Sequence, residues 1–151
     1  MKDSLRTGIS FGLTSAVITT LGLMVGLHSG TGSKWVVIGG VFTIAIADAF
    51  SDALGIHVSE ESENIHTVTQ IWVATIATFT AKFIFALTFV VPILFLPLLK
   101  AIIVSLVWGL SMLTVLSYYM AKTKGERPWK TVGEHVLIAT VVISITHWVG
   151  D

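Results

Sequence analysis

Apolar residues fall into five long runs separated by short polar segments. The runs cover about residues 8–27, 35–57, 67–91, 101–120 and 132–150. At a rise of about 1.5 Å per residue, each run can cross the hydrocarbon core of a bilayer as one helix. The pattern therefore predicts an all-α membrane protein, with residues 1–151 forming a single transmembrane domain of five helices.

The segments between the runs are rich in turn-forming or charged residues. "HSGTGSK" follows the first run, the acidic "SEESENIH" follows the second, and the basic "AKTKGERPWK" precedes the fifth. "VVPILFLPLLK" carries two prolines, which predict a tight turn near the membrane surface. The first run is too long for the apolar core of a typical cleavable signal, so we expect a retained span.

The distribution of basic residues predicts the orientation. Five crossings place the two termini on opposite sides of the membrane. With a cytoplasmic N-terminus, six basic residues lie inside and two outside; the inner ones are Lys2, Arg6, Lys122, Lys124, Arg127 and Lys130, and the outer ones are Lys34 and Lys100. Because basic residues concentrate in cytoplasmic loops, this orientation is favoured.

Composition narrows the classes of function. The chain is 54% hydrophobic and only 12% charged, and its net charge of zero gives no reason to expect a nucleic-acid partner. It has no cysteine, which excludes disulfides, thiolate metal sites and cysteine nucleophiles. No phosphate-binding glycine loop, zinc-binding helix motif or nucleophile constellation occurs, so we do not expect an enzyme.

Two aspartates interrupt the second apolar run. Asp48 and Asp52 are one helical turn apart, so they share one helix face. An aspartate near the bilayer centre costs roughly 2.5–3.5 kcal/mol on insertion scales, which requires a use or a compensating partner. Carboxylate oxygens suit divalent cations and protons. The pair predicts either a cation site that alternates between metal and proton or a buried hydrogen-bond or ion-pair network.

Lys82, within the third run, bears on that choice. If its ammonium group bonds the aspartates, the site loses a charge and a ligand. Alternatively, Lys82 is a displaceable counter-charge that is released when metal arrives. The sequence leaves both interpretations open.

Other polar residues could contribute to the same site. Ser15 and Thr19, in the first run, could offer oxygen ligands to the metal. His57, Glu60 and Glu63 could gather cations at the cytoplasmic mouth, although an interfacial histidine and a solvated acidic turn explain them more simply. Small residues four apart in the first run, such as Gly12–Ala16 and Gly22–Gly26, indicate close helix packing.

Two stretches resemble the vacuolar iron transporter family. "RTGISFGLTSAVITTLGLMVGL" is similar to its first span, roughly R-x-x-I-F-G-x-N-D-G-x-V-T-T, and "ADAFSDALGIHVSEESE" to its second, roughly S-M-x-x-G-E-Y-x-S-x-K-S-E. "VVPILFLP" and "KTKGERPWKTVGEHVLIA" are similar to its later segments. The resemblance extends in order over nearly the whole chain.

The resemblance implies a homodimer of five-helix protomers that exchanges ferrous or manganous ions for protons along a path between the protomers. Three departures from the family pattern bear on the metal site. The first-span aspartate falls on Ser15, the second-span methionine on Asp52, and the glutamate of the G-E-Y step on Ile56. The long cytoplasmic metal-binding domain is reduced to a short acidic turn. A carboxylate in place of a thioether favours a harder or less selective cation.

The sequence therefore predicts a divalent metal transporter, by metal/proton antiport, that exports metal from the cytoplasm. Its partners are the bilayer, divalent cations, protons and a second copy of the chain; the metal is the substrate and no cofactor is expected. Two alternatives remain: a non-transporting scaffold or regulator with the same fold, and a carrier of a different cation or solute. The expected location is the plasma membrane of a prokaryote or a vacuolar or organellar membrane of a eukaryote.

Overall fold

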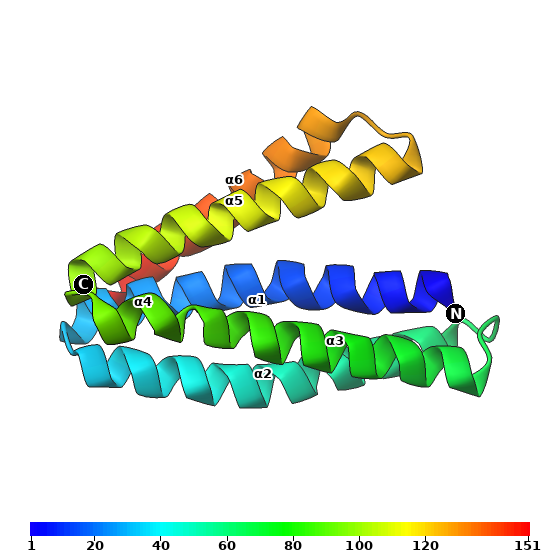
Figure 1. Ribbon diagram of the computed structural model, residues 1–151, viewed down its shortest axis with the longest axis horizontal. Helices are drawn as coiled ribbons and strands as arrows, with labels where there is room; N and C mark the ends of the chain where they lie inside the picture. The colour runs from blue at the N-terminus through cyan, green and yellow to red at the C-terminus, as the bar shows by residue number, and fades with distance from the viewer.

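The computed structural model describes all 151 residues, and its only regular elements are helices. The chain begins with a hairpin of two long helices, α1 (Lys2–Thr31) and α2 (Lys34–Ser62). The next helix, α3 (Val68–Thr88), returns along both of them (Figure 1). These three helices form the more closely packed half of the molecule.

The second half begins with a short helix, α4 (Val90–Phe95), which continues α3 after a break. It leads into a second long hairpin, α5 (Leu98–Lys124) and α6 (Pro128–Gly150). With α3 and α4 taken together, five helical segments are long and apolar enough to cross a membrane, so the all-helical, five-span prediction is confirmed at this level. The two termini lie at opposite ends of the bundle (Figure 1).

Local signals explain where the helices start and stop. α1 ends at Gly32, whose φ of 57° is the left-handed conformation that glycine adopts readily. The hydroxyl of Ser33 accepts a hydrogen bond from the backbone of Val36 at the start of α2. α3 begins with a capping box in which Thr67 and Gln70 satisfy each other's backbone N–H groups.

The tight turn predicted for "VVPILFLP" is wrong in part, because residues 90–95 form the helix α4. Pro92 lies in the first turn of that helix, where a backbone N–H has no intrahelical partner, so proline is tolerated there. The following residues do turn. Lys34 stabilises this turn by donating to the carbonyl oxygens of Leu94 at 3.0 Å and Leu96 at 3.4 Å.

Glycines set how closely α1 approaches its neighbours. A Cβ atom at Gly12 would lie 2.6 Å from the carbonyl oxygen of Thr78, so α1 and α3 meet backbone to backbone there. Toward the other end of α1, Cβ atoms at Gly22 and Gly26 would lie 3.0 and 3.1 Å from Val142 and Thr146 of α6. The packing role predicted for Gly12, Gly22 and Gly26 is confirmed.

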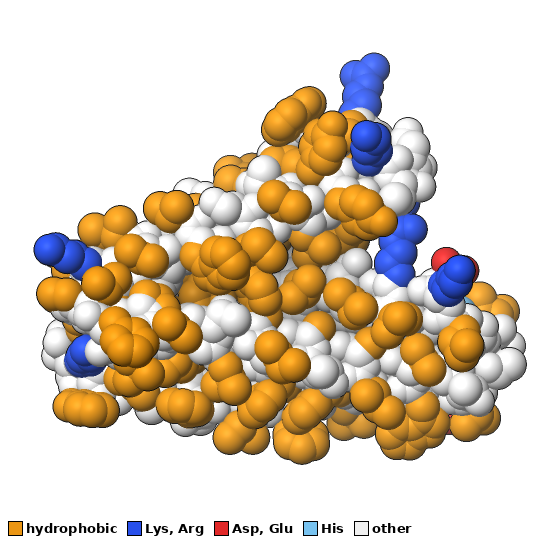
Figure 2. All heavy atoms as spheres, in the orientation of Figure 1, with side chains coloured by type: hydrophobic (Ala, Val, Ile, Leu, Met, Phe, Trp, Pro, Cys, Tyr) orange, Lys and Arg blue, Asp and Glu red, His pale blue; other side chains and the backbone are white.

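The surface is compatible with a bilayer. Large hydrophobic side chains are exposed on every long helix, and Figure 2 shows them covering most of the visible face. Lysine and arginine side chains gather toward the two ends in that view. A protein surrounded by water rarely exposes so large a continuous apolar surface.

Candidate functional site

Lys82 of α3 is the centre of a polar network inside the bundle. Its side chain is only 1% exposed, and its ammonium group forms ion pairs with Asp48 and Asp52 of α2. It also donates to the hydroxyl of Ser15 on α1, at 2.6 Å. Three helices therefore contribute to one site, and four residues singled out in the sequence meet there.

The network lies halfway along the helices that form it. Asp48 is at the midpoint of α2, since that helix runs from Lys34 to Ser62. Lys82 lies at the middle of the helical segment formed by α3 and α4 together, and Ser15 lies close to the middle of α1. If the helices cross a membrane, the charged groups lie near its midplane.

The charges in this network do not cancel when all three groups are ionised. An ammonium group has three N–H donors, and Lys82 faces three acceptor residues, so its donors match its partners in number. Two carboxylates and one ammonium leave a net charge of −1. A lone negative charge at this depth is costly, so an added positive charge such as a bound cation would stabilise the network.

The two aspartates are held unequally. Asp52 accepts a hydrogen bond from Lys82, whereas Asp48 meets the ammonium group without the geometry of a directed hydrogen bond. The Asp48 side chain is also more exposed, 26% against 17% for Asp52. Asp48 is thus the more accessible and less firmly bonded carboxylate.

Asp48 opens onto a groove of about 650 Å³ between α1 and the first half of α2. The groove's polar groups come from Thr43, Asp48 and Ser51, and its apolar wall includes Leu23 and Leu27 of α1. Lys82 does not line it. A cation in this groove can therefore reach Asp48 without passing the ammonium group, which lies behind the carboxylates.

Sequence reasoning missed Thr43 and Ser51 as groove residues. Both belong to a series of small or hydroxyl residues at intervals of four along α2, and all six members are exposed: Gly39, Thr43, Ala47, Ser51, Gly55 and Ser59. That interval was the available signal, because each member lies about 40° around the helix from the one before it, so the series follows α2 as one continuous line that passes the aspartates.

Thr19 and His57 lie outside the Lys82 network. The Thr19 hydroxyl donates to the backbone oxygen of Ser15 at 2.9 Å. His57 is two and a half helical turns beyond Asp48, so at about 100° per residue it lies on the opposite face of α2. Its Nδ1 is 2.9 Å from the Thr75 hydroxyl, and its ring meets Trp72 edge to face.

Glu60 and Glu63 meet His66 where α2 ends. The Nε2 atom of His66 lies 3.4 Å from Glu60 Oε2 and 3.2 Å from Glu63 Oε2. Glu60 is buried, whereas Glu63 is exposed. The predicted mouth residues thus form two groups, with His57 against α3 and the glutamates around His66. His135 has a different partner again, Ser117, at 2.7 Å.

The protomer supplies only part of a metal coordination shell. Nowhere do three or more histidine, aspartate or glutamate side chains gather in a way that could hold a metal ion. The central site offers two carboxylates and the Ser15 hydroxyl, all oxygen donors suited to hard divalent cations. Additional ligands would have to come from water or from another chain. No protein-family model and no curated protein matches this sequence.

Proposed function

We propose that this protein is an integral membrane carrier that exports a divalent cation, of the Fe²⁺ or Mn²⁺ kind, in exchange for protons. One observation carries the proposal. Two carboxylates lie at the middle of the bundle, and one of them, Asp48, lines an open groove, while the ammonium group that compensates both is buried. A purely structural ion pair gains nothing from leaving one of its carboxylates accessible at that depth.

The charge of the site determines how many protons are exchanged for each metal ion. With Lys82 charged and one proton shared by Asp48 and Asp52, the site is neutral. With a divalent cation on both carboxylates and Lys82 uncharged, it is neutral again. Moving between these two states releases two protons for each metal ion, and a neutral site avoids the cost of net charge near the midplane.

The two aspartates have different roles in metal binding in this scheme. Asp48 is the carboxylate that meets a cation in the groove, because it lines the groove and accepts no directed hydrogen bond from Lys82. Asp52 then exchanges its hydrogen bond from Lys82 for the metal, with Ser15 as a further oxygen donor. The resemblance to vacuolar iron transporters supports a divalent metal as the substrate, and the carboxylate at position 52 favours a hard one.

The transporting unit in this proposal is a homodimer formed along α2. Cβ atoms built at Gly39 and Gly55 would meet nothing within 4 Å, so the exposed surface of α2 has room for another helix at each of these glycines. Small residues four apart allow helices to approach closely within a membrane. A second copy on this face would cover the groove and could add ligands to the cation at Asp48.

The direction of transport follows from the proposed orientation. The excess of basic residues at the end that carries the N-terminus favours the cytoplasmic side for that end. Glu60 and Glu63 lie at the same end, where they would attract cations. The groove extends from Asp48 toward the opposite end of α2 and would serve as the exit.

Thermal unfolding of the detergent-solubilised protein tests cation binding. A cation that binds only the folded protein stabilises it by about 2.7 kcal/mol at 100 times its dissociation constant. We expect Mn²⁺ to raise the melting temperature of the unmodified protein and to have no effect on Asp48→Asn. Glu134→Gln, which removes an exposed carboxylate of α6, is the matched control and should keep the shift. A shift of unchanged size in Asp48→Asn would contradict the proposed site.

The match between the donors of Lys82 and its partners favours a second candidate, a membrane scaffold or regulator that does not transport. In that case the network is a permanent structural element. The protein would then show no melting-temperature shift with Mn²⁺, Fe²⁺, Co²⁺ or Zn²⁺ and no flux of any of them. Competition among these ions, and with other solutes, would reveal a carrier of different cargo.

A further inference from the structure

A separate cleft lies between α1 and the α5–α6 hairpin, on the side of α1 away from the groove at Asp48. It exists because glycines hold α6 against α1 only at the end of α1 that carries Gly22 and Gly26, and the hairpin diverges from α1 toward the N-terminal end (Figure 1). Neither the carboxylate network nor the proposed transport mechanism uses this cleft.

The mouth of the cleft is polar and carries more positive than negative charge. It forms a cavity of about 440 Å³ lined by Asp3, Arg6, Thr7, Ser10, Phe11, Thr14, Met120, Lys124 and His135. The Arg6 side chain contacts the hydroxyl of Thr123 on α5 across the opening. Figure 2 shows basic side chains at this gap between the hairpin and the rest of the bundle.

His135 is fixed in orientation at this mouth. Its Nδ1 lies 2.7 Å from the hydroxyl of Ser117, and Ser117 is fully buried. That contact leaves Nε2 as the ring nitrogen available for a ligand. Two cationic side chains, one histidine and three hydroxyls therefore line the cavity, against the single carboxylate of Asp3.

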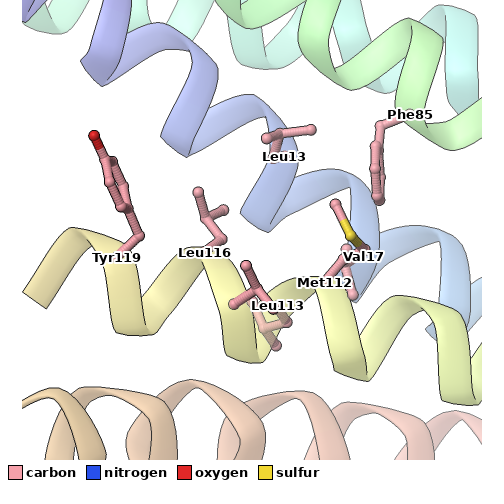
Figure 3. A pocket seen from close by; sticks show the side chains of 8 residues that line it. Leu13, Val17, Phe85, Met112, Leu113, Leu116 and Tyr119 are labelled. Carbon is pink, nitrogen blue, oxygen red and sulfur yellow. The ribbon is translucent and has the colours of Figure 1, made fainter.

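Deeper in the bundle the α1–α5 side of the cleft becomes entirely apolar. Leu13 and Val17 of α1, Phe85 of α3 and a stretch of α5 enclose a pocket of about 200 Å³ (Figure 3). The α5 side chains are Met112, Leu113, Val115, Leu116 and Tyr119. Tyr119 of the apolar pocket and Met120 of the polar mouth are adjacent in α5, so the two cavities lie at neighbouring levels of the bundle.

The polar mouth and the apolar pocket together extend over about the depth of one membrane leaflet. Arg6 and Val17 are about three helical turns apart on α1, which corresponds to about 16 Å along the helix. Half of a typical hydrocarbon core is about 15 Å. A ligand of this site therefore has an anionic head near Arg6 and Lys124 and an apolar tail that ends near the middle of the membrane.

We propose that this cleft binds one anionic phospholipid of the leaflet that faces the N-terminus. Its phosphate would lie between Arg6 and Lys124, its ester oxygens near the hydroxyls of Thr7 and Ser10, and one acyl chain in the pocket beside Leu13. The bound phosphate relieves the repulsion between the two cations across the opening. This inference rests on the proposed membrane setting but does not depend on metal transport.

Lipid binding to the purified full-length protein, counted by native mass spectrometry, tests the inference. Palmitoyl-oleoyl phosphatidylglycerol is compared with phosphatidylcholine of the same chains. Each basic side chain near an anionic lipid is worth about fivefold in affinity. We expect phosphatidylglycerol to be preferred and the double variant Arg6→Gln/Lys124→Gln to lower that preference by about 25-fold.

The matched control is Lys122→Gln/Arg127→Gln, which removes the same charge from exposed positions that do not line the cleft. This control should keep the preference. Equal losses in both double variants, or no loss in the first, would overturn the inference. Circular dichroism confirms that each variant is folded.

Two further binding measurements distinguish a phospholipid from other ligands of the cleft. Short-chain dihexanoyl phosphatidylglycerol should bind much more weakly than the long-chain lipid, because it cannot fill the apolar pocket. Equal binding of inorganic phosphate would mean an anion site with no lipid specificity and would overturn the inference. A dimer in which a second copy fills the cleft and excludes lipid would also overturn the inference. Lipid binding without metal flux would leave this inference standing while the transport proposal fails.

Discussion

The α1–α3 half of the protein and the α5–α6 hairpin consist of similarly apolar helices, yet they pack very differently. More than half of the most apolar stretch of α1 is buried, against 11% for α6. α1 and α3 meet at glycines and at buried polar groups, whereas much of α5 and α6 faces outward. Apolarity determines that a helix can cross a membrane, but small residues and polar contacts determine how closely it packs.

Removing the charge of Lys82 should cause the largest loss of stability, because Lys82 joins the polar contacts that distinguish the α1–α3 half from the hairpin. Lys82→Met leaves Asp48 and Asp52 facing each other without a counter-charge, and breaking a buried pair costs about 3–5 kcal/mol. We expect the free energy of unfolding in detergent to fall by that amount. The triple variant Lys82→Met/Asp48→Asn/Asp52→Asn should recover most of the loss, and Lys100→Met, at an exposed lysine, should have little effect. A stable Lys82→Met protein would show that the network contributes little to folding.

A glycine substitution in each half should show how differently the α1–α3 half and the hairpin pack, with a loss of stability of intermediate size. Gly12→Val forces a side chain against the carbonyl oxygen of Thr78, and overpacking of this kind costs about 1–3 kcal/mol. Gly133→Val on α6 places the same atoms in open space. Chemical denaturation should separate the two variants clearly. Similar losses in both would mean that the α1–α3 contact is not the tighter one.

The smallest effect is expected within the hairpin. Ser117→Ala removes the hydrogen bond to His135 that joins α5 to α6, a loss of about 1 kcal/mol. Ser144→Ala is the control, because its exposed hydroxyl bonds only to the Thr140 carbonyl of its own helix. Denaturation curves of the two variants measure the difference. A loss as large as that of Lys82→Met would show that the hairpin is held by polar contacts as strongly as α1–α3 is.

The number, order and approximate limits of the spans could be predicted from the sequence, because long uncharged runs have few alternatives to a helix in a membrane protein. The helix ends were less predictable. α1 begins at Lys2, well before the apolar run, since a helix continues into the polar flank until a cap stops it. α4 was missed because two prolines indicate a turn more strongly than a short helix.

The central site was predictable only in part. The spacing of Asp48 and Asp52 placed them on one helix face, and the structure confirms that they converge on Lys82. The sequence could not decide whether Lys82 would reach them, because that depends on how α2 and α3 are rotated against each other. The Ser117–His135 contact and the cleft beside α1 likewise arise from long-range packing, which leaves no periodic pattern in the sequence.

Divalent-metal flux into proteoliposomes under an imposed pH gradient tests the central claim most directly. We predict Mn²⁺ movement driven by the proton gradient, two protons exchanged for each ion, and no dependence on the membrane potential. Flux should be lost in both Asp48→Asn and Asp52→Asn and retained in Glu134→Gln. The account is contradicted if the folded protein moves no divalent cation, or if both aspartate variants transport at the unmodified rate.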